Sequence, residues 1–225
     1  MKSVCIGDMK LEVPIIQGGM GVGISLGNLA GHVAKNGGMG VISTAHPGYR
    51  AEDFEKNPTE VNKRELAKEI QKAKEIAKGK GMVAINAMVA ITDYAQMVEV
   101  AIKNKIDAII SGAGLPMNLP GFVKGTKVKI APIVSSGKAA RLICKTWDRR
   151  YHVAPDFVVI EGSEAGGHLG FHKEDVLNKT TAKLADIFKE VKETLQPFVE
   201  KYQKEIPIFV AGGVHNQAVH PAREQ

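Results

Sequence analysis

The sequence predicts an α/β fold of the (β/α)8-barrel type, in which parallel strands alternate with helices. Short apolar runs alternate with amphipathic stretches along the whole chain, which is typical of a parallel sheet joined by helical crossovers. Nearly every apolar run ends in a loop of small or polar residues. A barrel gathers all its strand ends around one central site, whereas a doubly wound sheet needs such loops mainly at its switch point. The pattern therefore favours the barrel.

Seven strands are expected, because each short apolar run can be buried on both faces of a parallel sheet. These runs cover residues 13–17, 39–43, 82–86, 107–111, 127–134, 156–160 and 206–211. Helices are expected between them, at 25–36, 59–78, 93–103, 138–147 and 182–204. In the second helix, Leu66, Ile70, Ala73 and Ala77 recur at helical spacing. Because no linker interrupts this alternation, residues 1–213 are expected to form one barrel domain.

Composition and charge disfavour several classes of protein. The chain has 225 residues, of which 44% are hydrophobic, enough for a sizeable core. The net charge is +6, but the lysines gather in 59–80 and 183–204 among glutamates. That mixture indicates solvated helix faces rather than a nucleic-acid surface. The two cysteines, Cys5 and Cys144, form neither a disulfide framework nor a metal motif.

We expect neither a targeting signal nor a membrane span. No apolar run approaches the roughly 18 residues of a membrane span, and the first residues lack the apolar region of a signal peptide. We therefore expect a cytoplasmic protein that acts on a small-molecule substrate, without a nucleic-acid or membrane partner. A homo-oligomer is compatible with this expectation.

The most informative segment is the loop at residues 161–170, which follows the apolar run 157–160. Four glycines in these ten residues allow the backbone to approach a ligand closely. His168 lies in the middle, and imidazole is well suited to proton transfer near neutral pH. The loop predicts a ligand cradle that carries its own acid/base group. The alternative is an ordinary turn with a solvated histidine.

Glycines at two other strand ends bear on nucleotide binding. Gly19, Gly21 and Gly23 follow the first expected strand, but their spacing is not that of a dinucleotide fingerprint, and no acidic residue ends the second strand. A Rossmann fold is therefore disfavoured. Gly212 and Gly213 follow the seventh strand, where a barrel can bind phosphate through bare backbone N–H groups.

Taken together, five segments resemble the flavin-dependent nitronate monooxygenase family, formerly called 2-nitropropane dioxygenases, which includes the flavin-type enoyl-acyl-carrier-protein reductases. The segments are Pro14-Ile15-Ile16-Gln17-Gly18-Gly19-Met20-Gly21, Ala84-Ile85-Asn86, Ser111-Gly112-Ala113-Gly114, Glu164-Ala165-Gly166-Gly167-His168-Leu169-Gly170 and Val210-Ala211-Gly212-Gly213. They occur in the family's order. The loop around His168 is the most specific of them.

The resemblance implies that residues 1–213 form an FMN-binding barrel with His168 as the catalytic or substrate-orienting residue. The implied cofactor-binding residues are Gly19, Met20, Gly21, Asn86, Glu161, Gly166, Gly167, Gly212 and Gly213. Glycines suit a flat cofactor whose face tolerates no bulk. Asn86 could instead cap a turn, and Met20 could plug the core. His172 lies four residues after His168, but glycines beside them argue against a helix, so no metal site is expected.

The resemblance implies oxidation of alkyl nitronates with O2, and the alternative is an enoyl-acyl-carrier-protein reductase that uses NAD(P)H. The resemblance ends after Gly213, and residues 214–225 lack apolar periodicity. We expect them to be an aberrant or truncated tail and the eighth strand–helix unit to be missing. An incomplete barrel has unpaired strand edges, which adds a third alternative, an inactive fragment with impaired flavin binding.

Overall fold

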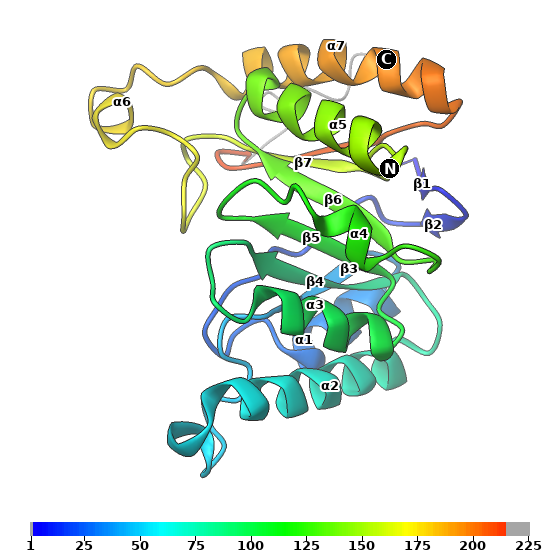
Figure 1. Cartoon of the computed structure of the whole chain (residues 1–225), viewed down its shortest axis with the longest axis vertical. Coiled ribbons are helices and arrows are strands. Elements are labelled where there is room, and N and C mark those ends of the chain that lie inside the picture. The colour runs from blue at the N-terminus through cyan, green and yellow to red at the C-terminus, as the bar shows by residue number, and fades with distance from the viewer. Residues whose placement is uncertain (1, 215–225) are drawn as a thin grey trace.

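A computed structural model describes residues 2–214 of the chain, and its centre is a six-stranded parallel sheet (Figure 1). The strands lie in chain order, so neighbours in sequence are neighbours in space. They are β3 (Met39–Ser43), β4 (Met82–Met88), β5 (Ala108–Gly112), β6 (Lys129–Val134), β7 (Val158–Glu161) and β8 (Ile208–Ala211). This order is that of a barrel wall that has not closed, which confirms the predicted α/β fold of an incomplete barrel. The tail expected at 214–225 lies, apart from Val214, outside the described residues.

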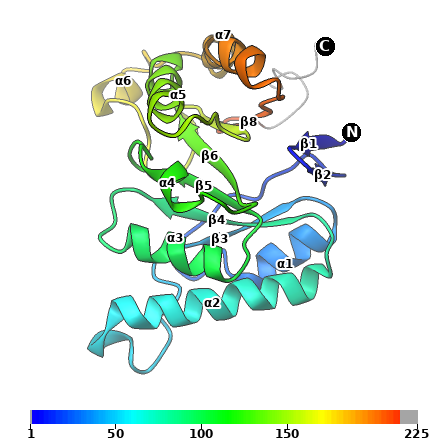
Figure 2. The ribbon, with the colours of Figure 1, turned by 45° about the vertical axis from the view of Figure 1, so that its right-hand side comes forward.

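Helices alternate with these strands and pack against the sheet (Figure 2). The five longer ones are α1 (Gly27–Lys35), α2 (Pro58–Ala77), α3 (Tyr94–Lys103), α5 (Gly137–Tyr151) and α7 (Leu184–Tyr202). Three short ones, η1 (Phe54–Lys56), α4 (Leu119–Phe122) and α6 (Lys173–Leu177), lie in connections. None of the helices within residues 2–214 has the length and apolar character needed to cross a membrane.

Local chemistry explains where the helices begin and end. At the start of α2, the Asn57 side chain accepts a hydrogen bond from the Glu60 N–H, and Pro58 occupies the first helical position. At the start of α5, the Ser136 hydroxyl accepts a hydrogen bond from the Ala139 N–H. Both helices end at a residue in the left-handed conformation, Lys78 and His152.

Successive side chains of each strand point to opposite faces of the sheet and build two separate cores. The outer core joins the sheet to the helices and includes Ile42, Ile85, Ile109, Ile143 and Trp147. The inner core lies on the concave side and contains Ile6, Leu11, Met39, Val41, Met82, Ala84, Ala108, Ile110, Ala131 and Phe157. The inner face of the sheet is therefore apolar over most of its length.

An antiparallel hairpin of β1 (Val4–Ile6) and β2 (Met9–Leu11) lies at the N-terminal ends of the parallel strands. It contributes Ile6 and Leu11 to the inner core, both fully buried. Its turn is anchored by an ion pair between Asp8 and Lys129, the first residue of β6. The hairpin is not among the predicted elements, although two apolar runs around Gly7-Asp8 are a hairpin signal. Gly7 adopts a positive φ of 61°, as that turn requires.

The expected strand at 13–17 is reduced to one bridge between Ile16 and Met39. Hydrogen bonds from Gln17 N–H to Met39 C=O (3.0 Å) and from Met39 N–H to Ile15 C=O (2.9 Å) keep this segment beside β3. Pro14 lacks an N–H, and Gly18 and Gly19 follow at once, so the ladder cannot extend. The sheet consequently has six strands where seven are predicted. At its other edge, every residue of β8 is half-buried.

Candidate functional site

The C-terminal ends of the parallel strands bring polar side chains together above the apolar inner core. Ser43, Asn86, Ser135 and Glu161 each lie two residues beyond an inner-face residue of β3, β4, β6 or β7. The two-residue period of a strand therefore directs them to the same inner face. We refer to these four residues as the mouth. In Figure 1 it lies on the side toward which the strand arrows point, opposite the β1–β2 hairpin.

The glycine-rich segment 17–25 is fixed beside the mouth by Ser25, which is fully buried. The Ser25 hydroxyl donates to the Gly18 carbonyl (3.0 Å) and accepts from the Met20 N–H and from Gln17 Nε2, both at 2.8 Å. The Gln17 Oε1 accepts a hydrogen bond from the N–H of Val41 in β3 (3.1 Å). Ser25 and Gln17 are not among the predicted site residues. Their partners become apparent only when the segment folds back on itself.

Asn86 lies directly beneath this segment. Its Nδ2 donates to the Gly19 carbonyl (3.4 Å), while its Oδ1 is buried and has no hydrogen-bond partner among the described residues. A Cβ at Gly19 would lie 2.4 Å from the Asn86 Cβ, and one at Gly21 would lie 2.7 Å from the Ala45 Cβ. The packing of the protein itself therefore requires glycine at both positions. Met20 between them is 47% exposed and does not plug the core.

The loop around His168 is held at its two ends by neighbouring strands. The Gly162 N–H donates to the Ala211 carbonyl of β8 (2.9 Å), and the Ser135 hydroxyl donates to the Gly170 carbonyl (3.0 Å). His168 itself is exposed and forms no hydrogen bond or ion pair with the rest of residues 2–214. Its imidazole is therefore free to meet a ligand.

The glycines of this region divide into two groups. A Cβ added at Gly166 or Gly167 would meet nothing within 4 Å, so both border open space. At Gly212, with a φ of 88°, a Cβ would lie 2.6 Å from the Ala165 nitrogen, and Gly213, with a φ of 75°, faces Glu164. The structure thus brings Gly212 and Gly213 against the loop that carries His168, as strands ending at one mouth should do.

Glu161 is the acidic residue of the mouth. It is half-buried at the end of β7, and burial raises the pKa of its carboxyl above the usual value because a charge is costly away from water. Within the described residues its carboxylate has no hydrogen-bond partner. It can therefore accept hydrogen bonds from a ligand.

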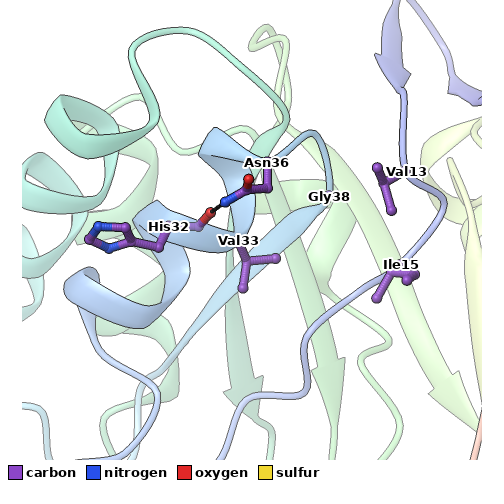
Figure 3. A pocket seen from close by; sticks show the side chains of 6 residues that line it. All are labelled: Val13, Ile15, His32, Val33, Asn36 and Gly38. Carbon is purple, nitrogen blue, oxygen red and sulfur yellow. Dashed lines mark hydrogen bonds between the residues drawn. The ribbon is translucent and has the colours of Figure 1, made fainter.

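A separate apolar groove of about 340 Å3 lies away from the mouth (Figure 3). It is lined by Val13, Ile15, His32, Val33, Asn36 and Gly38, and Gly38 immediately precedes the N-terminal end of β3. Its histidine is turned away from Val13 and Ile15, and Nδ1 of that ring is bound to the Asn28 carbonyl of the same helix (2.8 Å). His32 is the one titratable residue in its lining. Residues 2–214 also contain no cluster of three or more side chains that could hold a metal ion.

Comparison with known proteins identifies a family that the chain matches. A family model described as nitronate monooxygenase matches residues 2–219. FabK from Thermotoga maritima is similar in structure, with a TM-score of 0.66 and 24% identity over 93% of this chain and 53% of that chain. A nitroalkane oxidase from Streptomyces ansochromogenes has a TM-score of 0.65 and 18% identity over 91% of this chain and 59% of its own. At these identities the likeness establishes the fold, and the chain spans little more than half the length of either structure. No curated protein matches it.

Proposed function

Because the chain belongs to the nitronate monooxygenase family, whose enzymes are FMN-dependent oxidoreductases, we propose that it oxidises alkyl nitronates with FMN and O2. The observation that carries this proposal is at the mouth, where Asn86 presents a buried acceptor with no partner among the described residues, directly against the glycine-rich segment 17–25. A protein that only needed a stable core would not be expected to keep such a group, because a buried polar atom without a hydrogen bond costs about 1–3 kcal/mol.

Asn86 of the mouth and the glycines of the strand-end loops suit FMN in three respects. An N–H group on the edge of the flavin ring would supply the donor that the Asn86 Oδ1 lacks. The open space at Gly166 and Gly167 leaves room for a flat ring. Gly212 and Gly213 have no side chains to keep a phosphate from their N–H groups. Ser25 fixes the segment that contains Gly19, Met20 and Gly21, and these three residues would border the flavin ring.

When bound, FMN would supply the two-electron acceptor for the substrate and the group that O2 reoxidises. The residues of this chain would bind and orient the substrate. We assign His168 to the nitronate, because its exposed imidazole has no partner among the described residues and can donate a hydrogen bond to the anionic nitro oxygens. Glu161 would accept hydrogen bonds at the inner side of the mouth, and the exposed Met20 would give the ligand an apolar contact.

The test uses the full chain loaded with excess FMN and then desalted. We expect flavin absorption bands near equimolar occupancy and anaerobic bleaching of those bands by propyl-2-nitronate, with colour restored by O2. His168→Ala should lower nitronate turnover by about 100-fold and leave FMN occupancy unchanged. His172→Ala is the matched control, because that histidine is also exposed in the same segment, and it should retain turnover.

Other outcomes would favour the alternatives. Bleaching by NADPH but not by nitronate would contradict the proposed substrate and support an enoyl-thioester reductase. A protein that folds cooperatively but stays colourless would contradict FMN binding by this chain and support an inactive fragment.

A further inference from the structure

A second cavity, of about 420 Å3, opens at the N-terminal ends of β6, β7 and β8, the end of the sheet opposite the mouth. Its walls come from residues 123–130, which lead into β6, from the last turn of α5 with residues 150–156, and from Lys204 after α7. The volume lies within the range of about 300–1,000 Å3 that small-molecule sites occupy. We refer to it as the basic cavity, because of the side chains that line it.

The charge of the basic cavity is one-sided. Five lysine or arginine residues line it, namely Lys124, Lys127, Lys129, Arg150 and Lys204, together with His152 and one acidic residue, Asp156. A hollow lined by charges of one sign concentrates the local potential and attracts counter-ions. The cavity therefore favours an anion.

Two of the five cations already have structural roles. Lys204 donates to the Ala154 carbonyl (2.9 Å) and to Asp156 (3.2 Å), and Lys129 pairs with Asp8 of the hairpin turn. These contacts fix the loops that enter β6 and β7. Lys124, Lys127 and Arg150 form no ion pair within residues 2–214, although Lys127 lies close enough to lower the pKa of Asp8. Three cations are thus left to meet a ligand.

The helix dipole gives a structural reason for only one of these three unpaired cations. Arg150 lies in the last turn of α5, where a cation is favoured by the negative end of the helix dipole. Lys124 and Lys127 belong to no helix. They lie on either side of Gly125, which has a φ of 78° and open space where a Cβ would be.

The walls between the cations are apolar, formed by Pro120, Val123, Val128, Val153 and Ala154. A free inorganic ion would gain nothing from them, whereas the body of an organic molecule would. We propose that the basic cavity binds a small phosphorylated organic molecule, with its phosphate groups held by Lys124, Lys127 and Arg150. This site is separate from the phosphate-binding role proposed for Gly212 and Gly213, which lie at the other end of the sheet.

Thermal unfolding of the full chain with inorganic pyrophosphate and with AMP tests the proposal at constant ionic strength. A ligand that binds only the folded state raises the midpoint of unfolding in a saturable way. We expect a saturable shift below millimolar concentration, and we expect Lys124→Glu with Lys127→Glu to weaken the apparent affinity at least tenfold. Lys72→Glu is the matched control, because Lys72 is exposed on α2 and has no ion-pair partner in the described structure. It should keep the wild-type shift.

Three results would overturn the proposal. The first is no saturable shift of the unfolding midpoint for wild type. The second is a loss of affinity in the Lys72→Glu control equal to that in the double variant. The third is a shift that survives in the double variant, which would place the anion elsewhere. If the double variant does not fold, Lys124→Gln with Lys127→Gln removes the same charges without adding acidic ones, and the same criteria apply. The tests need no FMN turnover, so the proposal stands or falls apart from the proposed oxidation.

Discussion

The side chain of Asn86 reaches back to the carbonyl of Gly19, 67 positions earlier in the chain, with an Nδ2 to oxygen distance of 3.4 Å. This contact joins β4 to the glycine-rich segment 17–25. The hydrogen bond is long, and the other polar atom of the same side chain, Oδ1, is buried without a partner in the described structure. Asn86 therefore contributes little hydrogen bonding to the fold, and its unpaired Oδ1 suits a role in binding a ligand.

Asn86→Ala should therefore change stability little and cofactor binding much. We expect a loss of less than about 1 kcal/mol in the free energy of unfolding, because the variant loses one long hydrogen bond and one unsatisfied oxygen. The dissociation constant of FMN should rise about tenfold, the effect of losing about 1.4 kcal/mol. Urea unfolding and fluorescence titration with FMN would measure the two quantities.

Asn62→Ala provides the opposite control. Asn62 is 1% exposed, and its Oδ1 accepts a hydrogen bond from the N–H of Gly48 (3.1 Å). Its removal leaves a buried donor unpaired and should cost about 1–3 kcal/mol. If Asn86→Ala is as destabilising as Asn62→Ala and binds FMN normally, Asn86 is structural after all.

Gly19→Ala should destabilise the protein by about 1–3 kcal/mol, because a Cβ would lie 2.4 Å from the Asn86 Cβ in a packed region. Gly18→Ala should be within about 0.5 kcal/mol of wild type, since a Cβ there meets nothing within 4 Å. Thermal unfolding of both variants without FMN separates packing from ligand contact. Equal stability of the two variants would mean that segment 17–25 does not lie on Asn86.

Glu161→Gln should stabilise the protein near neutral pH. Burial raises the pKa of the Glu161 carboxyl in the folded state above its ordinary value of 4.5. The protonated carboxyl therefore favours the folded state, and this contribution is fully present at pH values below 4.5. This contribution is lost as the pH rises through the folded-state pKa. The midpoint of unfolding of the variant should exceed that of wild type at pH 7 and equal it near pH 3.

Glu174→Gln serves as a control for this pH profile, because Glu174 is exposed on α6. It should follow wild type at both pH values. A Glu161→Gln protein that is less stable than wild type at pH 7 would show that the carboxylate has a favourable partner in the folded state.

The two cysteines should differ sharply in reactivity. Cys5 is exposed, whereas Cys144 is buried in α5, and burial raises the pKa of its thiol to about 12. Since the thiolate is the reactive form, a disulfide reagent at pH 8 should label one thiol per native chain and two in denaturant. Cys5→Ser should give none and one, respectively. Rapid labelling of Cys144 in the native Cys5→Ser protein would contradict the packing of α5 against the sheet.

Local signals in the sequence were sufficient to predict much of the fold. The apolar run at 39–43 coincides with β3, and the helical spacing of Leu66, Ile70, Ala73 and Ala77 places α2 within one residue of its observed ends. Strand and helix periods are properties of consecutive residues, so they can be read without a structure. The segment 13–17 differed because Pro14 and the following glycines interrupt a ladder that its apolar residues alone would favour.

The sequence by itself determined the alternation of strands and helices, the glycine-rich loops at the strand ends and the family to which the chain belongs. Only the tertiary structure decided that Gly19 covers Asn86, that Ser25 holds the segment beside it, and that Lys124, Lys127 and Arg150 border one cavity. The reason is physical. Secondary structure follows from interactions between near neighbours in the chain, whereas these contacts join positions many residues apart and exist only after the sheet has brought its strand ends together.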